Sequence, residues 1–411
     1  MPDRSQDHET ETLSTLLAAD VSRPDNGTRE ISPRALKAIR VHLGMDVAFI
    51  SEFKDGTRVF RHVDSGLEDP PIKVGDGDDL ADSYCQRVAQ GKLPELIRDA
   101  SKEPAALELP ATLGLPVGAH LSVPITLSDG EIYGTFCCFS FTPDESLTER
   151  DLAVMKVFAE FVAEEVDREK QFERVKQEAY RRIQRVIAGD GLRMVFQPIV
   201  DLADGAPAGF ESLARFSPKP PRGPDIWFKE AADVGLSEAL DLTAMRASVA
   251  RLPDLPGKTF LTVNITPTTA LSPHLGEVLA GIDSSRVILE VTEHSSVASY
   301  EDLAIALAPL RSRGLRVAVD DAGAGYASFR HILRLQPEFI KLDISISRSI
   351  DTDPAKRALA SALIAFARDT KSTLIAEGVE TEDELATLQK LGIGLAQGYF
   401  LGRPAELPTA T

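Results

Sequence analysis

The sequence has few cysteines and no apolar run long enough to cross a membrane. Only three cysteines occur in 411 residues, Cys85, Cys137 and Cys138. An odd, sparse set is typical of reduced thiols and not of a secreted disulfide framework. The first residues, Met1-Pro2-Asp3-Arg4, lead into acidic sequence and not into a signal peptide. We therefore expect a soluble cytoplasmic protein with no membrane partner.

Positive charge is also scarce. Lys and Arg number 45 against 63 Asp and Glu, which gives a formal net charge of −18 and a sequence pI of about 4.9. This balance excludes a broad grip on a nucleic-acid polymer or on an anionic membrane. It leaves room for a small anionic ligand, because bound metal ions and a few local cations override the global field.

The first part of the chain predicts a tail followed by a mixed domain. Residues 1–28 are polar and acidic and predict a disordered tail. Residues 29–167 combine helices with strand pairs, and we expect a helix over 33–43 and strands over 46–53, 58–63, 120–125 and 132–141. Antiparallel strands flanked by helices predict an α+β sensor domain.

A long charged helix is predicted from about residue 147 to residue 189, starting at the capping pattern Ser146-Leu-Thr-Glu149. Apolar residues recur along it at spacings of three and four, at Phe158, Val162, Val166, Phe172, Val175, Ala179, Ile183 and Val186. We expect the first half to pack on the sensor domain. Residues 168–189 are interpreted as a linker helix that pairs in a homodimer. A helix packed only on its own domain is the alternative.

Residues 190–408 alternate short apolar strands with helices. Candidate strands cover 193–200, 208–215, 259–265, 286–292, 315–320, 338–343, 372–377 and 394–399. Eight such units predict an α/β domain with a (β/α)₈ TIM-like barrel. Only residues 201–207 separate the first two strands, too few for a crossover helix, so this pair is predicted to be antiparallel.

Polar residues stand where these strands end. They are Glu211, Asn264, Glu290, Asp320, Asp321, Lys341 and Glu377. Strand period two points Asn264, Lys341 and Glu377 into the barrel. Clustered carboxylates in a low dielectric repel unless cations neutralise them. Ion pairs of Lys341 with Asp343 or Glu290 that merely tie strands together are the alternative, but the number of acids favours a metal-dependent hydrolase.

Several ordered motifs carry a family resemblance. They are Phe196-Gln-Pro-Ile-Val200, Glu211-Ser-Leu-Ala-Arg215, Asn264-Ile-Thr-Pro267, Glu290-Val-Thr-Glu293, Asp320-Asp-Ala-Gly-Ala-Gly-Tyr326, Ile340-Lys-Leu-Asp343, Ala376-Glu-Gly-Val-Glu-Thr381 and Gln397-Gly-Tyr399. Over about residues 190–407 the chain resembles the EAL domain, which hydrolyses cyclic di-GMP to linear pGpG. The resemblance implies this activity, with two Mg²⁺ or Mn²⁺ ions in each active site.

The resemblance also implies roles for single residues. Glu211, Asn264, Glu290 and Asp320 would hold one metal, and Asp320, Asp321 and Glu377 the second. Lys341 and Glu377 would be catalytic. Gln197, Leu213, Arg215 and Gln397, together with Glu211, Asn264 and Asp320, would contact the substrate. Glu293, Gly323, Gly325, Asp343 and Glu380 would support the ligands and the loop after Asp321.

The chain departs from the EAL pattern at three positions. Ser212 replaces the signature Ala, and Ala322 and Ala324 stand where a Phe and a Thr or Ser are expected. Every expected metal ligand is present, which favours an active phosphodiesterase. The altered loop favours the alternative, a catalytically silent domain that acts as a cyclic di-GMP receptor or binds a partner protein.

The front half resembles a GAF domain through its final strand pair and Tyr133-Gly-Thr-Phe-Cys-Cys138. GAF domains bind small ligands or chromophores, or dimerise, and the sequence leaves the ligand and the direction of regulation open. No Cys-His dipeptide is present. Small thiols in strands are usually core, so we interpret the three cysteines as buried core, with redox activity or bilin attachment as the alternative.

Overall fold

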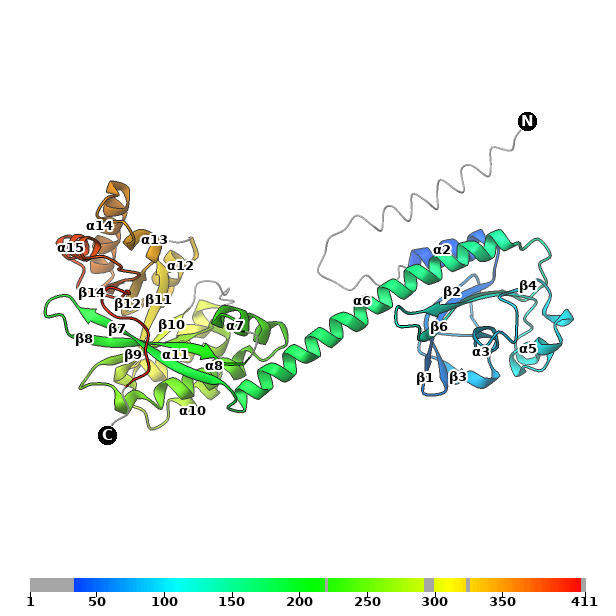
Figure 1. The fold of residues 1–411 in the computed structure, drawn as a ribbon, viewed down its shortest axis with the longest axis horizontal. Coiled ribbons are helices and arrows are strands. Elements are labelled where there is room, and N and C mark those ends of the chain that lie inside the picture. The colour runs from blue at the N-terminus through cyan, green and yellow to red at the C-terminus, as the bar shows by residue number, and fades with distance from the viewer. Residues whose placement is uncertain (1–32, 219–220, 292–298, 323–325, 408–411) are drawn as a thin grey trace, which may run out of the picture. The chain divides into compact units, whose positions relative to one another are not determined.

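In a computed structural model the chain folds as two compact units, which divide between Val175 and Lys176 (Figure 1). The structure describes residues 33–218, 221–291, 299–322 and 326–407. The predicted tail over 1–28 lies outside these ranges, as do Glu293, Gly323 and Gly325. Within the described ranges, no helix combines the length and the apolar character that crossing a membrane requires.

The first unit is built on a six-stranded antiparallel sheet in the order β3-β2-β1-β6-β5-β4. Its strands are β1 (Val47–Lys54), β2 (Thr57–Ser65), β3 (Gly77–Asp79), β4 (Leu96–Ile97), β5 (Ala119–Thr126) and β6 (Ile132–Ser140). The four predicted strands are confirmed. Edge strands β3 and β4 were not predicted, since two or three residues are too few to display a period of two.

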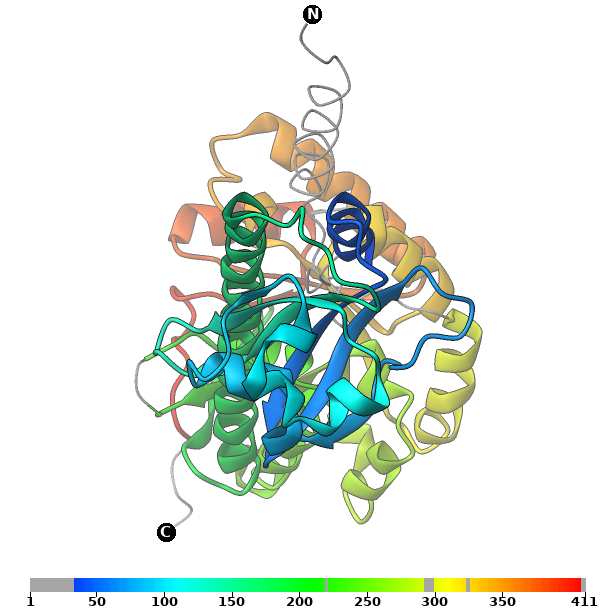
Figure 2. The ribbon, with the colours of Figure 1, turned by 90° about the vertical axis from the view of Figure 1, so that its right-hand side faces the viewer.

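Helices cover both faces of this sheet. On one face, α2 (Pro33–His42) and α6 (Glu149–Ile187) form a single apolar cluster with the sheet, and Figure 2 shows them on the same side of it. The other face carries α3 (Tyr84–Ala89), α4 (Pro104–Leu107) and α5 (Pro110–Gly114). Alternate residues of each strand therefore enter two different cores, and the predicted α+β fold is confirmed.

Helix α6 starts two residues later than the capping pattern predicts. The Asp151 carboxylate accepts from Thr148 N and Thr148 Oγ1, both at 2.8 Å, whereas Ser146 Oγ donates to Asp144 at 2.6 Å. The predicted cap at Ser146 is therefore wrong. Asp144 lies two residues from Ser146 and takes its hydroxyl, so Thr148 is left as the cap.

The last turns of α6 do not belong to a free linker. Ile183 and Val186 are fully buried against Trp227, Ala231 and Leu240 of the second unit. Of the apolar stripe predicted for residues 168–189, Phe172 and Val175 remain exposed, at 64% and 54%. The second unit covers its own end of the helix, which the sequence analysis did not foresee.

The second unit is a closed eight-stranded barrel in the order β10-β11-β12-β13-β14-β7-β8-β9. Its strands are β7 (Leu192–Asp201), β8 (Pro207–Phe216), β9 (Phe260–Ile265), β10 (Val287–Val291), β11 (Arg316–Ala322), β12 (Phe339–Leu342), β13 (Thr373–Ala376) and β14 (Leu395–Ala396). β7 is antiparallel to both neighbours, and the other pairs are parallel. The predicted barrel with an antiparallel first pair is confirmed.

Helices surround the barrel between most strands. They are α7 (Pro224–Asp233), α8 (Ser237–Val249), α9 (Pro267–Ala270), α10 (His274–Val278), α11 (Tyr300–Arg311), α12 (Tyr326–Leu335), α13 (Ile344–Ser347), α14 (Pro354–Asp369) and α15 (Glu382–Leu391). Inside the barrel, one apolar layer is formed by Ile199, Phe260, Ile288, Ala318, Phe339 and Ile375. Two residues further along several strands, the same inward face carries the polar side chains.

Candidate active site

Four carboxylates, three at or just beyond the ends of their strands and Glu211 in the middle of β8, surround one lysine. The Lys341 Nζ lies 2.7 Å from Glu377 Oε1, 3.0 Å from Glu290 Oε2, 3.3 Å from Asp320 Oδ1 and 3.5 Å from Glu211 Oε1. These residues belong to β8, β10, β11 and β12, or follow β13 directly. Their convergence follows from strand register, because Glu290 is level with Asn264 of β9 and Lys341 with Ile375 of β13.

The cluster is deeply buried and short of positive charge. Lys341 is 1% exposed and Glu290 is fully buried. Burial pulls the pKa of Lys341 down, but Asp320, Glu211 and the other two carboxylates outweigh it and hold that pKa well above its usual value. The ammonium therefore stays charged, and one positive charge faces four acids.

Two of the acids are shifted toward their neutral form. Burial raises the pKa of Glu290 well above its usual value, and Lys341 offsets this only in part. Burial likewise raises the pKa of Glu377 to about 8, with the charges of Asp320 and Glu211 adding to the shift. In both cases the ionised carboxylate is destabilised, and a further cation at this point of the barrel would stabilise it.

Amide side chains hold Glu211, one of the other two acids, in place. Gln397 Nε2 donates to Glu211 Oε2 at 2.6 Å and to Gln197 Oε1 at 3.0 Å. Asn264 Nδ2 donates to Glu211 Oε1 at 3.2 Å, and Gln197 Nε2 donates to the Gly402 carbonyl at 3.0 Å. Glu211 is thus fixed from both oxygens, and Gln197, Asn264 and Gln397 are brought into the site as the sequence analysis expects.

Other expected residues lie beside this cluster and contact different groups. Asp343 caps α13 by accepting from Ser345 N at 2.8 Å. Arg215 Nη1 donates to the Ala214 carbonyl at 2.8 Å, and Leu213 is half-buried two residues before it on β8. Glu380 forms an ion pair with Arg348. Asp321 follows Asp320 in β11, and its side chain lies outside what the structure describes.

The substituted signature residue faces away from the site. Ser212 Oγ donates to Ser248 Oγ of α8 at 2.8 Å, and Ser248 Oγ donates to the Ala244 carbonyl at 2.8 Å. The Ser212 hydroxyl is thus bonded between strand and helix and makes no contact with Glu211 among these bonds.

Three residues with no role predicted from the sequence line a hollow of about 420 Å³ together with Glu380. Tyr399 and Phe400 are 52% and 48% exposed, and the Arg403 guanidinium lies 4.4 Å from the centre of the Tyr399 ring. All three follow β14, just beyond Gln397. Two adjacent aromatic residues and an arginine within six residues of Gln397 were the sequence signal that could have identified them.

The donor set fits hard divalent cations. Carboxylate and amide oxygens are the ligands that Mg²⁺ and Mn²⁺ prefer, and Glu290 Oε1 is buried without a hydrogen-bond partner in the described part of the chain. Among the described side chains, no three His, Cys, Asp or Glu residues already form a metal-binding group. The acids are spaced around the Lys341 ammonium, whose single charge balances only part of theirs.

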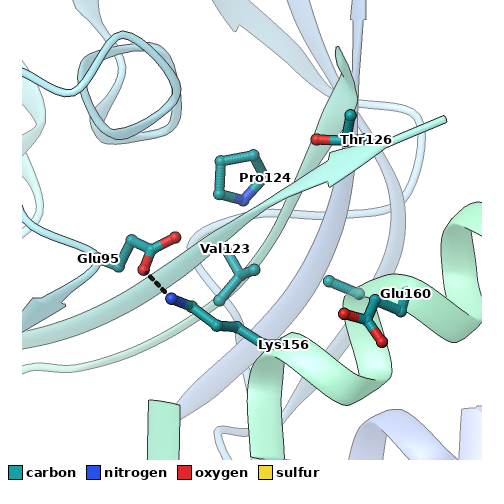
Figure 3. A pocket seen from close by; sticks show the side chains of 7 residues that line it. Glu95, Val123, Pro124, Thr126, Lys156 and Glu160 are labelled. Atoms are coloured by element: carbon teal, nitrogen blue, oxygen red, sulfur yellow. Dashed lines mark ion pairs between the residues drawn. The ribbon is translucent and has the colours of Figure 1, made fainter. Parts of the chain in front are cut away.

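The sensor unit offers a much weaker ligand site. A hollow of about 290 Å³ lies between β5 and α6, and Figure 3 shows Lys156 reaching across it to Glu95, with Nζ and Oε2 2.6 Å apart. Val123 and Ala159 form part of its wall. Because its two central charges already pair with each other, the hollow does not indicate a particular ligand.

Comparison with known proteins agrees with this geometry. Residues 180–404 match the EAL domain, and residues 28–166 match the GAF domain. An uncharacterized signaling protein of Caulobacter vibrioides is 32% identical over 240 residues, 56% of this chain and 30% of that protein. A probable cyclic di-GMP phosphodiesterase of Escherichia coli, PdeA, is 31% identical over 194 residues, 45% of this chain and 26% of that protein.

A solved structure supports the fold. The EAL domain of Xanthomonas citri FimX, in complex with c-diGMP, superposes with a TM-score of 0.51 at 20% identity and covers 59% of this chain and 99% of its own. The chain spans less than a third of the length of the two curated relatives above. The EAL match takes in more than half of the 411 residues, and the chain belongs to the EAL domain family.

Proposed function

We propose that this chain hydrolyses cyclic di-GMP to linear pGpG at the carboxyl ends of its barrel strands. One observation carries the proposal: four carboxylates of an EAL domain converge on a single buried ammonium and leave negative charge to be balanced. The similarity to PdeA supports the same substrate. A reduced compartment such as the cytoplasm suits its three free, buried cysteines.

Two divalent cations are part of the proposal. Glu211, Asn264, Glu290 and Asp320 would hold one, and Asp320 would share the second with Asp321 and Glu377. Such ions polarise a phosphodiester and lower the pKa of an attacking water. Gln397 orients Glu211 for this task by donating to its Oε2, and Gln197 holds Gln397 in place by accepting from the same Nε2.

Lys341 is assigned the neutralisation of charge, and Glu377 the acceptance of a proton. The Lys341 ammonium stands within 3.5 Å of all four acids and would neutralise charge that develops on the phosphate. Glu377 is bonded to this ammonium at 2.7 Å and lies at the rim, where it would accept a proton from water.

The hollow beside Glu380 suits part of the nucleotide. Tyr399 and Phe400 offer exposed rings on which a guanine base would stack, and Arg403 supplies a positive charge for a phosphate. Arg215, half-buried at the end of β8, is a second cation for phosphate.

The test is direct. The full chain is incubated with cyclic di-GMP and either Mn²⁺ or Mg²⁺, and products are separated by chromatography, with EDTA as the blank. We expect metal-dependent formation of pGpG. Tight binding of cyclic di-GMP without any pGpG would replace the enzyme by a receptor, and absence of both would reject the nucleotide altogether.

Pairing of two chains through α6 forms the second part of the proposal. Val157, Phe161, Phe172 and Val175 are 41–64% exposed, and at about 100° per residue they lie within about 60° of one another around the helix. Exposed apolar residues on one side of a helix, here with Glu164 and Arg168 between the two pairs, are typical of a helix that pairs. The sensor unit would then regulate the barrel by changing how the two helices pair.

Sedimentation of two matched double variants tests the pairing. Phe172→Glu/Val175→Glu puts charge into the exposed line, whereas Arg174→Glu/Gln177→Glu adds acid on the opposite side of the same helix. We expect the first to give monomers with altered turnover and the second to behave as the parent chain. A dimer unaffected by the first variant would reduce α6 to a spacer.

A further inference from the structure

The sensor sheet carries a buried polar patch beneath α3. Ser51, Thr135, Cys137 and Ser122 lie side by side on β1, β6 and β5, in register, and each is fully buried. Cys85 of α3 packs onto this patch and is also fully buried. The third cysteine, Cys138, points to the opposite face, where its Sγ lies 3.7 Å from Met155 Sδ.

Two of the cysteines touch each other. Cys85 Sγ and Cys137 Sγ are 3.4 Å apart, well beyond the roughly 2.05 Å of a disulfide and short enough for direct contact between thiols. The Cys137 thiol donates to Thr135 Oγ1 at 3.1 Å, and Ser122 Oγ also lies 3.1 Å from the Cys137 sulfur. The pair joins residues 52 positions apart in the chain.

A buried arginine distinguishes one sulfur from the other. Arg58 Nη1 donates to Cys85 Sγ at 3.1 Å, while its Nε donates to Asp78 Oδ1 at 2.8 Å. Arg58 is 7% exposed, so its charge is poorly screened. Because Asp78 is about half exposed, the arginine side of the patch lies nearest to solvent.

This arrangement separates the acidities of the three thiols. Burial opposes ionisation of Cys85, but the hydrogen bond from Cys137 and the charge of Arg58 lower its pKa to about 5. Burial raises the pKa of Cys137 well above its usual value, and it raises the pKa of Cys138 too. One thiolate therefore faces one thiol, which is the pairing that disulfide chemistry uses.

We propose that Cys85 and Cys137 are an oxidisable dithiol, which a small hydroperoxide converts into a disulfide between α3 and β6. The Cys85 sulfur attacks one peroxide oxygen, the O–O bond breaks, and the departing oxygen takes up a proton as water or alcohol. The Cys137 sulfur then attacks the Cys85 sulfenic acid, and water leaves with the Cys137 proton. Two thiols lose two electrons and the peroxide gains them.

The size of the oxidant follows from burial. Neither sulfur has an exposed surface, so hydrogen peroxide can reach the pair through small fluctuations of the six-residue helix α3, whereas a disulfide such as oxidised glutathione is too large. The modification lies in the sensor unit and does not depend on the proposed phosphodiesterase activity.

Thiol counting on the full chain tests the proposal. The reduced chain is treated with hydrogen peroxide, quenched with catalase, denatured and blocked with N-ethylmaleimide, and its mass is measured without reductant. We expect one maleimide per chain in place of three, the loss of two hydrogens, and a peptide crosslink that contains Cys85. Oxidised glutathione should leave all three thiols free.

Four variants identify the sulfurs. Cys138→Ala should form the same crosslink at the same rate, and Cys137→Ser should stop at a sulfenic acid that dimedone traps. Cys85→Ser should not react. Arg58→Gln, checked for folding by circular dichroism, should react about 10-fold more slowly. Three free thiols in the treated parent chain, or a crosslink in Cys85→Ser, would overturn the proposal.

Discussion

Two buried polar clusters lie in this chain, and they differ in how far their negative charges are neutralised. In the barrel, four carboxylates share the single ammonium of Lys341. In the sensor unit, Arg58 is shared between the carboxylate of Asp78 and the sulfur of Cys85, and hydroxyls complete the network around Cys137. The barrel cluster sets one cation against four acids, whereas the sensor cluster sets one cation against a single carboxylate and a single thiolate.

This difference separates two kinds of chemistry. A cluster with excess negative charge binds an external cation, because the cation relieves repulsion that burial has strengthened. A closed cluster with less excess charge requires no ligand and changes only when its own atoms react. Asp320 and Glu377 are each 17% exposed at the side chain, so the barrel cluster is open to ligands, whereas Cys85 and Cys137 have no exposed surface.

Removing one acid from the barrel cluster should have the largest effect. Glu211→Gln keeps the shape but removes a charge that Gln397, Asn264 and Lys341 all contact. We expect turnover to fall at least about 10³-fold, since metal stabilisation is worth several kcal/mol and each 1.4 kcal/mol is about tenfold. The rate of product formation at saturating Mn²⁺ measures this loss of turnover.

The matched control is Glu406→Gln, which breaks an exposed ion pair with Arg193. It should leave turnover unchanged, because exposed pairs contribute little. Equal activity in Glu211→Gln and the parent chain would remove Glu211 from the metal site.

Removing the ammonium tests the charge deficit itself. Lys341→Met leaves the four acids facing one another, and without metal we expect a loss of about 3 kcal/mol in the free energy of unfolding of the barrel. Mn²⁺ should raise the melting temperature of this variant more than that of the parent chain. Lys390→Met, at an exposed position in α15, is the control and should show neither change. The same Mn²⁺ shift in Lys341→Met and the parent would contradict the charge argument.

The barrel and its cluster could be predicted from sequence because each strand encodes its own inward face. Thr262 and Phe260 point inward and Leu261 outward, as a period of two requires, and this places Asn264 in the site with no tertiary information. The roles of the metal ligands remain predictions. Asp343 was expected near Lys341 but caps α13, since the strand ends at Leu342 and the inward alternation ends with it.

The sensor cluster could not be predicted in the same way. Arg58, Cys85 and Cys137 come from an edge-side strand, a six-residue helix and a central strand, and no local pattern relates them. Cys85 and Cys137 were interpreted as core, which their burial confirms, but the contact with Arg58 depends on long-range packing. The separation of Cys138 from Cys137 follows from alternation alone.

Glu377→Gln distinguishes a proton acceptor from a structural acid. We expect turnover to fall about 10²-fold, the scale of a positioned proton-transfer group, while cyclic di-GMP binding largely remains. Glu382→Gln, an exposed change in the first turn of α15, is the control and should keep full activity. A near-normal rate in Glu377→Gln would limit the role of Glu377 to its ion pair with Lys341.

The smallest effect is expected in the sensor unit, at a histidine of the same sheet face. Burial, and then the charge of Arg58, lower the pKa of His120 from 6.5 to about 3. Between these values the unfolded chain binds a proton that the folded chain does not, so stability should fall as pH falls, by up to about 1.4 kcal/mol per pH unit.

His120→Phe keeps a ring against Tyr84, whose ring centre lies 4.7 Å away, and should remove this dependence. Pulse proteolysis in urea between pH 4.5 and pH 7 measures it for the sensor unit, with Tyr84→Phe as a control that retains the histidine. If His120→Phe kept the acid sensitivity of the parent, the loss of stability at low pH would originate elsewhere. The buried imidazole would then not be its cause.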